Sequence, residues 1–301
     1  MPELERPSLD RRALGLALTR LANAKASDAL CAGVESETRA RRIGITGAPG
    51  AGKSTLAGRL ALHRSKHSRL GVLAIDPTSP KSGGAILGDR IRMDDLAGSE
   101  NLYIRSFGSR SASDGLTDNL PELLDTMDTF GFDEVILETV GVGQAEHAAR
   151  TQVDTLILVL PPDAGDVVQA MKAGIMELAD IYAVNKADMP SAMKMATEVK
   201  RIVALMHRRS DGWVPPVVLT SHSDSGSVAR LSEQVDRHFE WLLSTGQHGS
   251  RTHERQKYRL RRFFERRIQE ALNRASLSFF EMPLSEQTAQ IIATLGKEDR
   301  K

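Results

Sequence analysis

Cysteine is almost absent from this sequence, and its scarcity excludes several kinds of site. Cys31 is the single cysteine among 301 residues, so the chain can form neither an internal disulfide nor a metal site made of cysteines alone. Such sparse use of cysteine is typical of a reducing compartment. We expect Cys31 to be a small apolar residue on a helix face.

Excess charge and long apolar runs are missing as well. The net charge of +1 gives no overall field that would attract nucleic acid or a membrane. No run approaches the roughly 18 apolar residues of a membrane-spanning helix. The segment Met1–Arg6 has an acidic start and no apolar stretch after it, unlike a secretion signal. We therefore expect a cytoplasmic protein.

A glycine-rich loop is the most informative stretch that the chain does contain. It has the pattern G-x-x-x-x-G-K-S of a phosphate-binding loop, and its residues are Gly47, Ala48, Pro49, Gly50, Ala51, Gly52, Lys53, Ser54 and Thr55. Such glycines let successive N–H groups surround a polyphosphate, and the N-terminus of the following helix adds partial positive charge. We predict that Lys53 is a catalytic cation on the β- and γ-phosphates and that Ser54 binds Mg²⁺.

Apolar segments recur on both sides of this loop, with helical segments between them. They lie at 43–46, 71–75, 102–105, 134–138, 155–160, 181–184 and 217–220. Most are continuously apolar, as strands buried on both faces are. The alternation predicts an α/β fold, with a mainly parallel sheet of the P-loop NTPase kind and helices on both of its faces. Ligands are then expected at the carboxyl ends of the strands.

Three acidic residues follow predicted strands close to the phosphate loop. Asp76 ends the second strand, Asp89 lies in the loop rich in proline and glycine after it, and Glu138 ends the fourth strand. Either aspartate taken alone would more commonly be a cap or turn residue. Beside a phosphate loop, however, carboxylates in these places are typical ligands of Mg²⁺, directly or through water. We therefore predict metal or switch roles for all three.

The segment after Glu138 is expected to meet the γ-phosphate. Gly141 can bring its backbone N–H close to that group, because it carries no side chain. Gln144 lies three residues after Gly141 and is offset from the place of a water-orienting glutamine. The sequence therefore assigns no residue to orient the attacking water.

The sixth apolar segment runs into a guanine-reading motif, N-K-x-D. The Asp188 carboxylate can accept hydrogen bonds from N1 and the exocyclic amine of guanine, whereas adenine lacks both donors. Asn185 is expected to brace the loop, and the Lys186 stem to cover the base. After the next strand, N–H groups of Ser221, His222 and Ser223 are expected to meet the guanine O6. The predicted ligands are GTP and GDP with Mg²⁺.

Helical patterns flank this core at both ends. Residues 9–40 are predicted to be helical and to cover the sheet, with Leu14, Leu16, Leu18, Leu21 and Ala22 roughly on one face. Toward the C-terminus we expect helices at 227–245 and 251–274, separated by a break at Gly246 and Gly249, and a short helix at 285–295.

The helix at 251–274 combines many arginines with an apolar stripe. The stripe has spacings of three and four residues, and it consists of Leu260, Phe263, Phe264, Ile268, Ala271 and Leu272. No interleaved aromatic residues suit base stacking, so we expect packing against a second subunit or the body of the protein rather than RNA. The predicted organisation is an N-terminal helical extension (1–41), a GTPase domain (42–247) and a C-terminal dimerisation extension (248–301).

Taken in order, these motifs resemble one family. The sequence is similar to the MeaB-type GTPases of the SIMIBI class of P-loop proteins, the metallochaperones of adenosylcobalamin-dependent methylmalonyl-CoA mutase, some of which were formerly called arginine/ornithine transport kinases. The resemblance covers about residues 10–275, and it is most specific at 75–93, 138–146 and 174–188.

The resemblance implies a homodimer and a slow GTPase that its partner accelerates. Such a protein gates delivery of adenosylcobalamin to the mutase and ejection of damaged cofactor. By position, the metal and switch roles fall on Ser54, Asp76, Asp89 and Glu138. An additional switch loop falls on 163–174, with Lys172 at a lysine position linked to partner-stimulated hydrolysis.

Two departures from the family pattern bear on the partner. Residues 105–118 differ from the R-P-S-P and G-T-L-G-G stretches usual in the family, and Val167 replaces the usual acid of G-D-E-L-Q. Both lie in loops expected to face the partner. The mutase can therefore be methylmalonyl-CoA mutase or a relative such as the 2-hydroxyisobutyryl-CoA enzyme.

Three other functions remain open from sequence. A GTPase that inserts nickel into hydrogenase or urease is expected to carry Cys/His clusters, but the eight histidines are scattered. A nucleotide-dependent kinase of a transport system is the second alternative, although most kinases use adenine. The third is a binding module that hydrolyses nothing, which only a turnover measurement separates from a GTPase.

Overall fold

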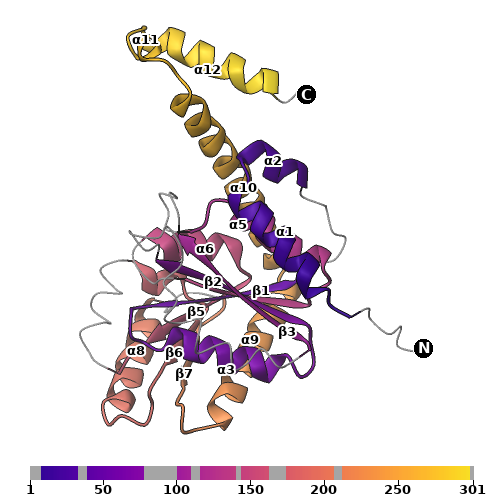
Figure 1. Cartoon of the computed structure of the whole chain (residues 1–301). Coiled ribbons are helices and arrows are strands. Elements are labelled where there is room, and N and C mark those ends of the chain that lie inside the picture. Colours follow the sequence, from indigo (N-terminus) through magenta and orange to yellow (C-terminus); the bar gives the residue numbers. More distant parts are fainter. Residues whose placement is uncertain are drawn as a thin grey trace.

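A seven-stranded sheet with all neighbours parallel forms the centre of the molecule (Figure 1), and its strand order is β3-β2-β4-β1-β5-β6-β7. The computed structural model describes residues 8–32, 39–77, 100–109, 116–139, 144–162, 174–206 and 212–298. The strands are β1 (Arg41–Gly47), β2 (Leu70–Pro77), β3 (Leu102–Ser109), β4 (Glu134–Glu138), β5 (Thr155–Leu160), β6 (Ile181–Val184) and β7 (Val217–Leu219). The predicted α/β fold is confirmed, and each strand overlaps a predicted apolar segment.

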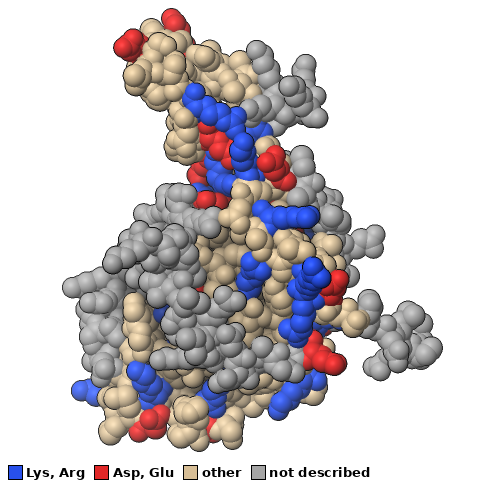
Figure 2. Space-filling view, in the orientation of Figure 1, with Lys and Arg blue, Asp and Glu red and all other residues tan. Residues whose placement is uncertain are grey.

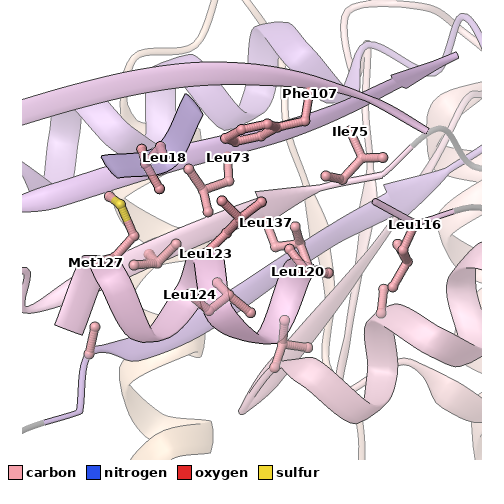
Figure 3. Close-up of a cluster of buried hydrophobic side chains, with 14 of the residues drawn as sticks. Leu18, Leu73, Ile75, Phe107, Leu116, Leu120, Leu123, Leu124, Met127 and Leu137 are labelled. Carbon is pink, nitrogen blue, oxygen red and sulfur yellow. The ribbon is translucent and has the colours of Figure 1, made fainter. Parts of the chain in front are cut away.

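Helices cover both faces of the sheet, because alternate residues of each strand point to opposite sides. On one face, Ile43 and Ile45 of β1 pack with α3 (Lys53–Arg64) and α9 (Gly226–Ser244). On the other face, Leu73 and Ile75 of β2 pack with the helices α1 (Arg11–Asn23), α5 (Leu120–Thr129) and α6 (Gln144–Gln152). Figure 3 shows this second cluster, in which leucines of α5 meet side chains of the sheet. Two-sided burial explains why the strands are apolar throughout.

The far edge of the sheet has its own small core. Buried side chains of α8 (Ala192–Met206) pack there with Tyr182 and Val184 of β6 and with residues of β5. A short 3-10 helix, η1 (Ile175–Leu178), precedes β6. No helix in the described ranges is long and apolar enough to cross a bilayer.

The described part of the N-terminal segment contains two helices, whereas residues 9–40 were predicted to be helical throughout. Asp10 caps α1 by accepting a hydrogen bond from the Ala13 N–H, and the chain turns extended at Ala24 before α2 (Ala26–Ala32). The buried face consists of Leu14, Leu18 and Leu21. The prediction for Leu16 was wrong, because two residues advance a helix by about 200° and its side chain is 52% exposed. Cys31 lies in α2, but its side chain falls outside the described residues.

Three helices complete the chain: α10 (Gln247–Asn273), α11 (Leu277–Phe280) and α12 (Leu284–Glu298). The predicted break is present at Gly246, whose φ of 72° is the left-handed conformation that separates α9 from α10. The prediction for Gly249 was wrong, since it lies in the first turn of α10. In Figure 1, α10 projects from the body and α12 crosses near its far end.

The body-facing side of α10 combines arginines with one aromatic residue, Tyr258, which is buried in the core cluster. Arg255 is buried and lies 2.5 Å from Asp154 at the start of β5, and Arg259 lies 2.6 Å from Asp125 of α5. Figure 2 shows positive and negative side chains gathered where α10 leaves the body. Leu260, Phe264 and Ile268 are instead 58%, 45% and 39% exposed. Ion pairs and the buried Tyr258 therefore dock the helix, while these three residues of the stripe remain exposed in the single chain.

Candidate functional site

The phosphate loop joins β1 to α3 at the carboxyl edge of the sheet, beside the neighbouring strands β4 and β5. Its backbone requires glycine at two places. Gly47 has a φ of 141°, and a Cβ there would lie 2.1 Å from the Val159 carbonyl oxygen of β5. Gly52 has a φ of 87°, and a Cβ there would lie 2.4 Å from the Asn185 amide nitrogen. The two glycines therefore let the loop pack tightly against the adjacent strand ends.

Lys53 and Ser54 begin α3 and point back into the site. The Lys53 Nζ donates to the Ala48 carbonyl oxygen at 3.1 Å, so the ammonium lies over its own loop. The Ser54 hydroxyl donates to Glu138 Oε1 at 2.6 Å. Phosphate oxygens are stronger acceptors than a carbonyl, so this lysine is placed to transfer its hydrogen bonds to a bound polyphosphate.

Two carboxylates end neighbouring strands at the same edge. Glu138 closes β4 and Asp76 lies near the end of β2, and both are at least 92% buried. A hydroxyl and carboxylates are hard oxygen ligands that suit Mg²⁺, which also keeps water and phosphate oxygens in its shell. Within the described ranges, no three His, Cys, Asp or Glu side chains converge into a metal site.

Three predicted site residues lie outside the described residues, namely Asp89, Gly141 and Lys172. The same holds for the side chain of Gln144, although its backbone begins α6. The roles predicted for these residues stay predictions.

Asn185 links three segments that are far apart in the sequence. Its amide nitrogen donates to the Ala51 carbonyl oxygen in the phosphate loop at 2.8 Å, and its amide oxygen accepts from the Thr220 hydroxyl at 3.0 Å. The next residue, Lys186, has a φ of 53°, which is uncommon for a residue with a side chain and marks a tightly held turn. The loops after β6 and β7 and the phosphate loop are thereby fixed against one another.

Asp188 lies within reach of the loop after β7. The buried Ser221 hydroxyl donates to Asp188 Oδ1 at 2.6 Å and lies 2.8 Å from the hydroxyl of Ser223. This bond from Ser221 is the main reason that the pKa of Asp188 lies below its usual range. The exposed carboxylate is therefore ionised at neutral pH and keeps lone pairs for a ligand. His222 and Ser223 are exposed beside it.

Comparison with known proteins agrees with this geometry. Residues 11–276 match the family described as methylmalonyl Co-A mutase-associated GTPase MeaB. The chain belongs to the MeaB family of GTPases. A solved structure titled LAO/AO transport system kinase has a TM-score of 0.64 and 22% identity, and the match covers 96% of this chain and 100% of that one. That likeness supports the fold.

Relatives of this MeaB-family chain are found in archaea, bacteria and animals. A putative GTPase of Pyrococcus abyssi is 42% identical over 207 residues, which cover 68% of this chain and 64% of that protein. A probable GTPase of Mycobacterium tuberculosis is 40% identical over 221 residues, covering 72% and 66%. A mouse protein named methylmalonic aciduria type A homolog, mitochondrial, is 35% identical over 212 residues, covering 68% and 51%. The match thus spans just under two thirds of the first two relatives and about half of the third.

Sequence reasoning missed polar residues buried beside the site of this MeaB-family chain. The hydroxyls of Thr46 and Thr139 lie 2.9 Å apart beneath the phosphate loop. Glu146, in the first turn of α6, is only 1% exposed. Burial raises its pKa above the usual range, although its own backbone N–H and the charge of Lys53 oppose that rise. Glu146, Ala149 and Val153 are spaced three and four residues apart, and the latter two are buried. This helical spacing is the sequence signal that would have predicted a buried Glu146.

Proposed function

We propose that this chain is a GTP-hydrolysing chaperone of an adenosylcobalamin-dependent acyl-CoA mutase, gating cofactor delivery and the protection or reactivation of the mutase. The match of residues 11–276 to a family described as mutase-associated GTPases carries this proposal. The partner is methylmalonyl-CoA mutase or a relative such as 2-hydroxyisobutyryl-CoA mutase, and the name of the mouse relative supports this class.

Guanine is the base that the proposed site selects. Asp188 is an ionised acceptor with lone pairs available, and guanine offers N1–H and the 2-amino group to it, whereas adenine offers neither. The Lys186 stem would cover one face of the base. Of the N–H groups of Ser221, His222 and Ser223, that of His222 is the proposed donor to O6, because the other two donate to Ser227 Oγ at 3.3 Å and to Ser221 Oγ at 3.2 Å. An adenine nucleotide would leave these polar groups unpaired, which costs roughly 1–3 kcal/mol each.

In phosphoryl transfer, the chain would supply positioning and charge. The loop N–H groups of 47–55 and the Lys53 ammonium would bind the β- and γ-phosphates. Ser54 and Glu138, with Asp76 and Asp89, would hold Mg²⁺ directly or through water, and the ion would neutralise charge that develops on the phosphate oxygens. Gly141 would meet the γ-phosphate through its N–H.

Hydrolysis is proposed to be slow in the isolated chain, because Gln144 is offset from the place where a water-orienting glutamine normally sits. The partner would complete the site by ordering the loop at 163–174 and recruiting Lys172. A cation added to the transition state would contribute about 2–4 kcal/mol, or roughly 30- to 1000-fold in rate.

The test is GTP turnover with and without an adenosylcobalamin-dependent mutase. The mutase is expected to stimulate the wild type, while Lys172→Ala keeps the intrinsic rate and GDP affinity but loses the stimulation. The matched control is Lys194→Ala, which changes an exposed lysine of α8. Full stimulation of Lys172→Ala would dismiss Lys172. Failure of every acyl-CoA mutase to stimulate the wild type would remove the chaperone function.

A further inference from the structure

Side chains of two helices hold the loop after β7 through hydrogen bonds to the same two backbone carbonyl groups of that loop. Arg59, in the second turn of α3, donates to the Ser221 carbonyl oxygen at 2.5 Å and to the Asp224 carbonyl oxygen at 3.2 Å. The buried Ser227 hydroxyl of α9 lies 3.2 and 2.6 Å from these same oxygens. Each carbonyl oxygen has two lone pairs, so both donors can be accommodated. The path of residues 221–224 is thereby fixed by a guanidinium that the sequence motifs did not single out.

This arrangement also fixes the direction of a backbone donor. The Ser221 carbonyl and the His222 N–H belong to one planar trans peptide, so they point in opposite directions. A carbonyl oriented toward Arg59 therefore orients the His222 N–H away from α3. Hydrogen bonds from a charged donor are roughly twice as strong as neutral ones, and they polarise the peptide so that its N–H becomes a better donor.

We propose that Arg59 is a positioning residue for guanine recognition, acting through the peptide between Ser221 and His222 on the His222 N–H, which would donate to guanine O6. This inference rests on the proposed guanine site at Asp188 and the loop after β7. Arg59 follows Lys53 by six residues on one helix, which is about 9 Å along the axis. A single rigid element would thus set both the phosphate-binding cation and the base-reading loop.

The contact from Arg59 differs in kind from the other arginine contact to this loop. Arg230 reaches the Asp224 side chain at 2.5 Å, with side chains 56% and 46% exposed. An exposed pair of that sort contributes little, and it leaves the carbonyl groups untouched. Arg230 is therefore a matched control that removes a guanidinium from the same loop without releasing the Ser221 peptide.

The test compares GDP with 6-thio-GDP by calorimetry on the full chain. In 6-thio-GDP, sulfur, a weak acceptor, replaces O6, while N1–H and the 2-amino group are kept. Arg59→Met is expected to weaken GDP binding about tenfold, since a charge-assisted contact that orients a donor is lost. Its affinity for 6-thio-GDP should stay within about twofold of the wild type, because that ligand uses the oriented N–H little. Arg230→Met should leave both affinities within about twofold.

Each outcome of this comparison decides the inference. An unchanged GDP affinity in Arg59→Met overturns it, and so does an equal loss for the two ligands, which would mean that Arg59 only supports the fold. Retained binding of 6-thio-GDP reports that the variant is folded. Asp188→Asn, measured with GDP and XDP, tests the underlying base site. If that variant still prefers GDP, the proposed guanine site is wrong. If its preference shifts to XDP while Arg59→Met behaves as the wild type, only the role of Arg59 fails.

Discussion

At the scale of single residues, two buried ionisable side chains lie close together at the carboxyl edge of the sheet. Lys53 is 8% exposed and already lies over the phosphate loop, and Glu146 lies close enough for the charge of Lys53 to oppose the rise in the Glu146 pKa that burial causes. A buried carboxylate is costly unless a positive charge or a hydrogen bond compensates it. The two residues therefore influence each other, and each can be tested separately.

Lys53→Ala is expected to lower GTP turnover by about 100-fold or more, because the cation placed on the phosphates stabilises charge that grows in the transition state. Affinity for GTP should also fall. Steady-state phosphate release measures the effect. The control is Lys66→Ala, which changes an exposed lysine just after the end of the same helix. A turnover number unaltered by Lys53→Ala would show that hydrolysis takes place elsewhere.

Glu146→Gln is expected to change how the free energy of unfolding depends on pH. Burial raises the pKa of Glu146 in the folded protein, so the folded state holds a proton that the unfolded state has released. The unfolding free energy then falls as pH rises from the ordinary glutamate range toward the raised pKa, and the loss persists above it. The glutamine variant should lack this fall and gain stability relative to wild type as the pH rises above the ordinary glutamate range.

Urea unfolding at several pH values measures this difference. Glu240→Gln, which changes an exposed glutamate of α9, is the control and should keep the wild-type pH dependence. Identical pH dependence in the wild type and Glu146→Gln would contradict a raised pKa.

Among the elements, α10 shows how buried arginines, together with Tyr258, dock a helix. Its buried positions include Arg255, Arg262 and Arg267, and Arg255 meets an Asp154 carboxylate that also accepts the Arg42 N–H at 2.8 Å. Farther from the body, the Arg267 guanidinium donates to the Leu295 carbonyl oxygen of α12 at 3.2 Å. These arginines are thus engaged in contacts within the chain.

Arg255→Ala is expected to lower the free energy of unfolding by about 3 kcal/mol, because removing one partner of a buried ion pair leaves the other uncompensated. Arg261→Ala is the matched control, since Arg261 is on the same helix but its side chain is 65% exposed in a pair with Glu265. That pair should contribute about 0.5 kcal/mol or less. Urea unfolding midpoints, measured with unchanged slopes, give the effect of each substitution. Equal midpoints for Arg255→Ala and the wild type would show that α10 docks without the Asp154 contact.

At the scale of the whole molecule, the C-terminal helices α10 to α12 leave large apolar side chains exposed. Leu260, Phe264 and Ile268 recur every fourth residue along α10, and Leu277 and Leu284 beyond it are 85% and 77% exposed. Such a run of exposed apolar side chains is typical of an interface. We propose that the C-terminal extension, 248–301, forms the contact of a homodimer.

The double substitution Phe264→Glu with Ile268→Glu is expected to convert the dimer to a single chain in light scattering, because charge inserted into an apolar interface is costly to desolvate. Folding of the body should be retained, since both side chains are exposed in the single chain. Lys257→Glu, at a side chain 73% exposed on the same helix, should remain dimeric. If the double variant also stays dimeric, the contact lies in the body of the protein.

Local patterns in the sequence were sufficient for much of this protein. Short stretches specify the phosphate loop, because its backbone requires glycine at set places. Short apolar stretches likewise specify the seven strands and their ends, because these strands are buried on both faces. For the same reason the sequence predicted where Gly47, Lys53, Ser54 and Glu138 lie, at the phosphate loop and the end of β4, while their functional roles stay predictions. The motif at Asn185–Asp188 predicted guanine because its chemistry is local to one loop.

Tertiary structure decided what depends on partners far along the chain. Helical periodicity identifies an apolar stripe on α10, but it does not say that arginines dock that helix, because Arg255 and Asp154 are 101 residues apart. The contact from Arg59 to Ser221 spans 162 residues, and nothing in the sequence around either residue indicates it. Packing of the helices on the sheet brings these groups together, and that packing alone determines which charges are paired and which surfaces stay open.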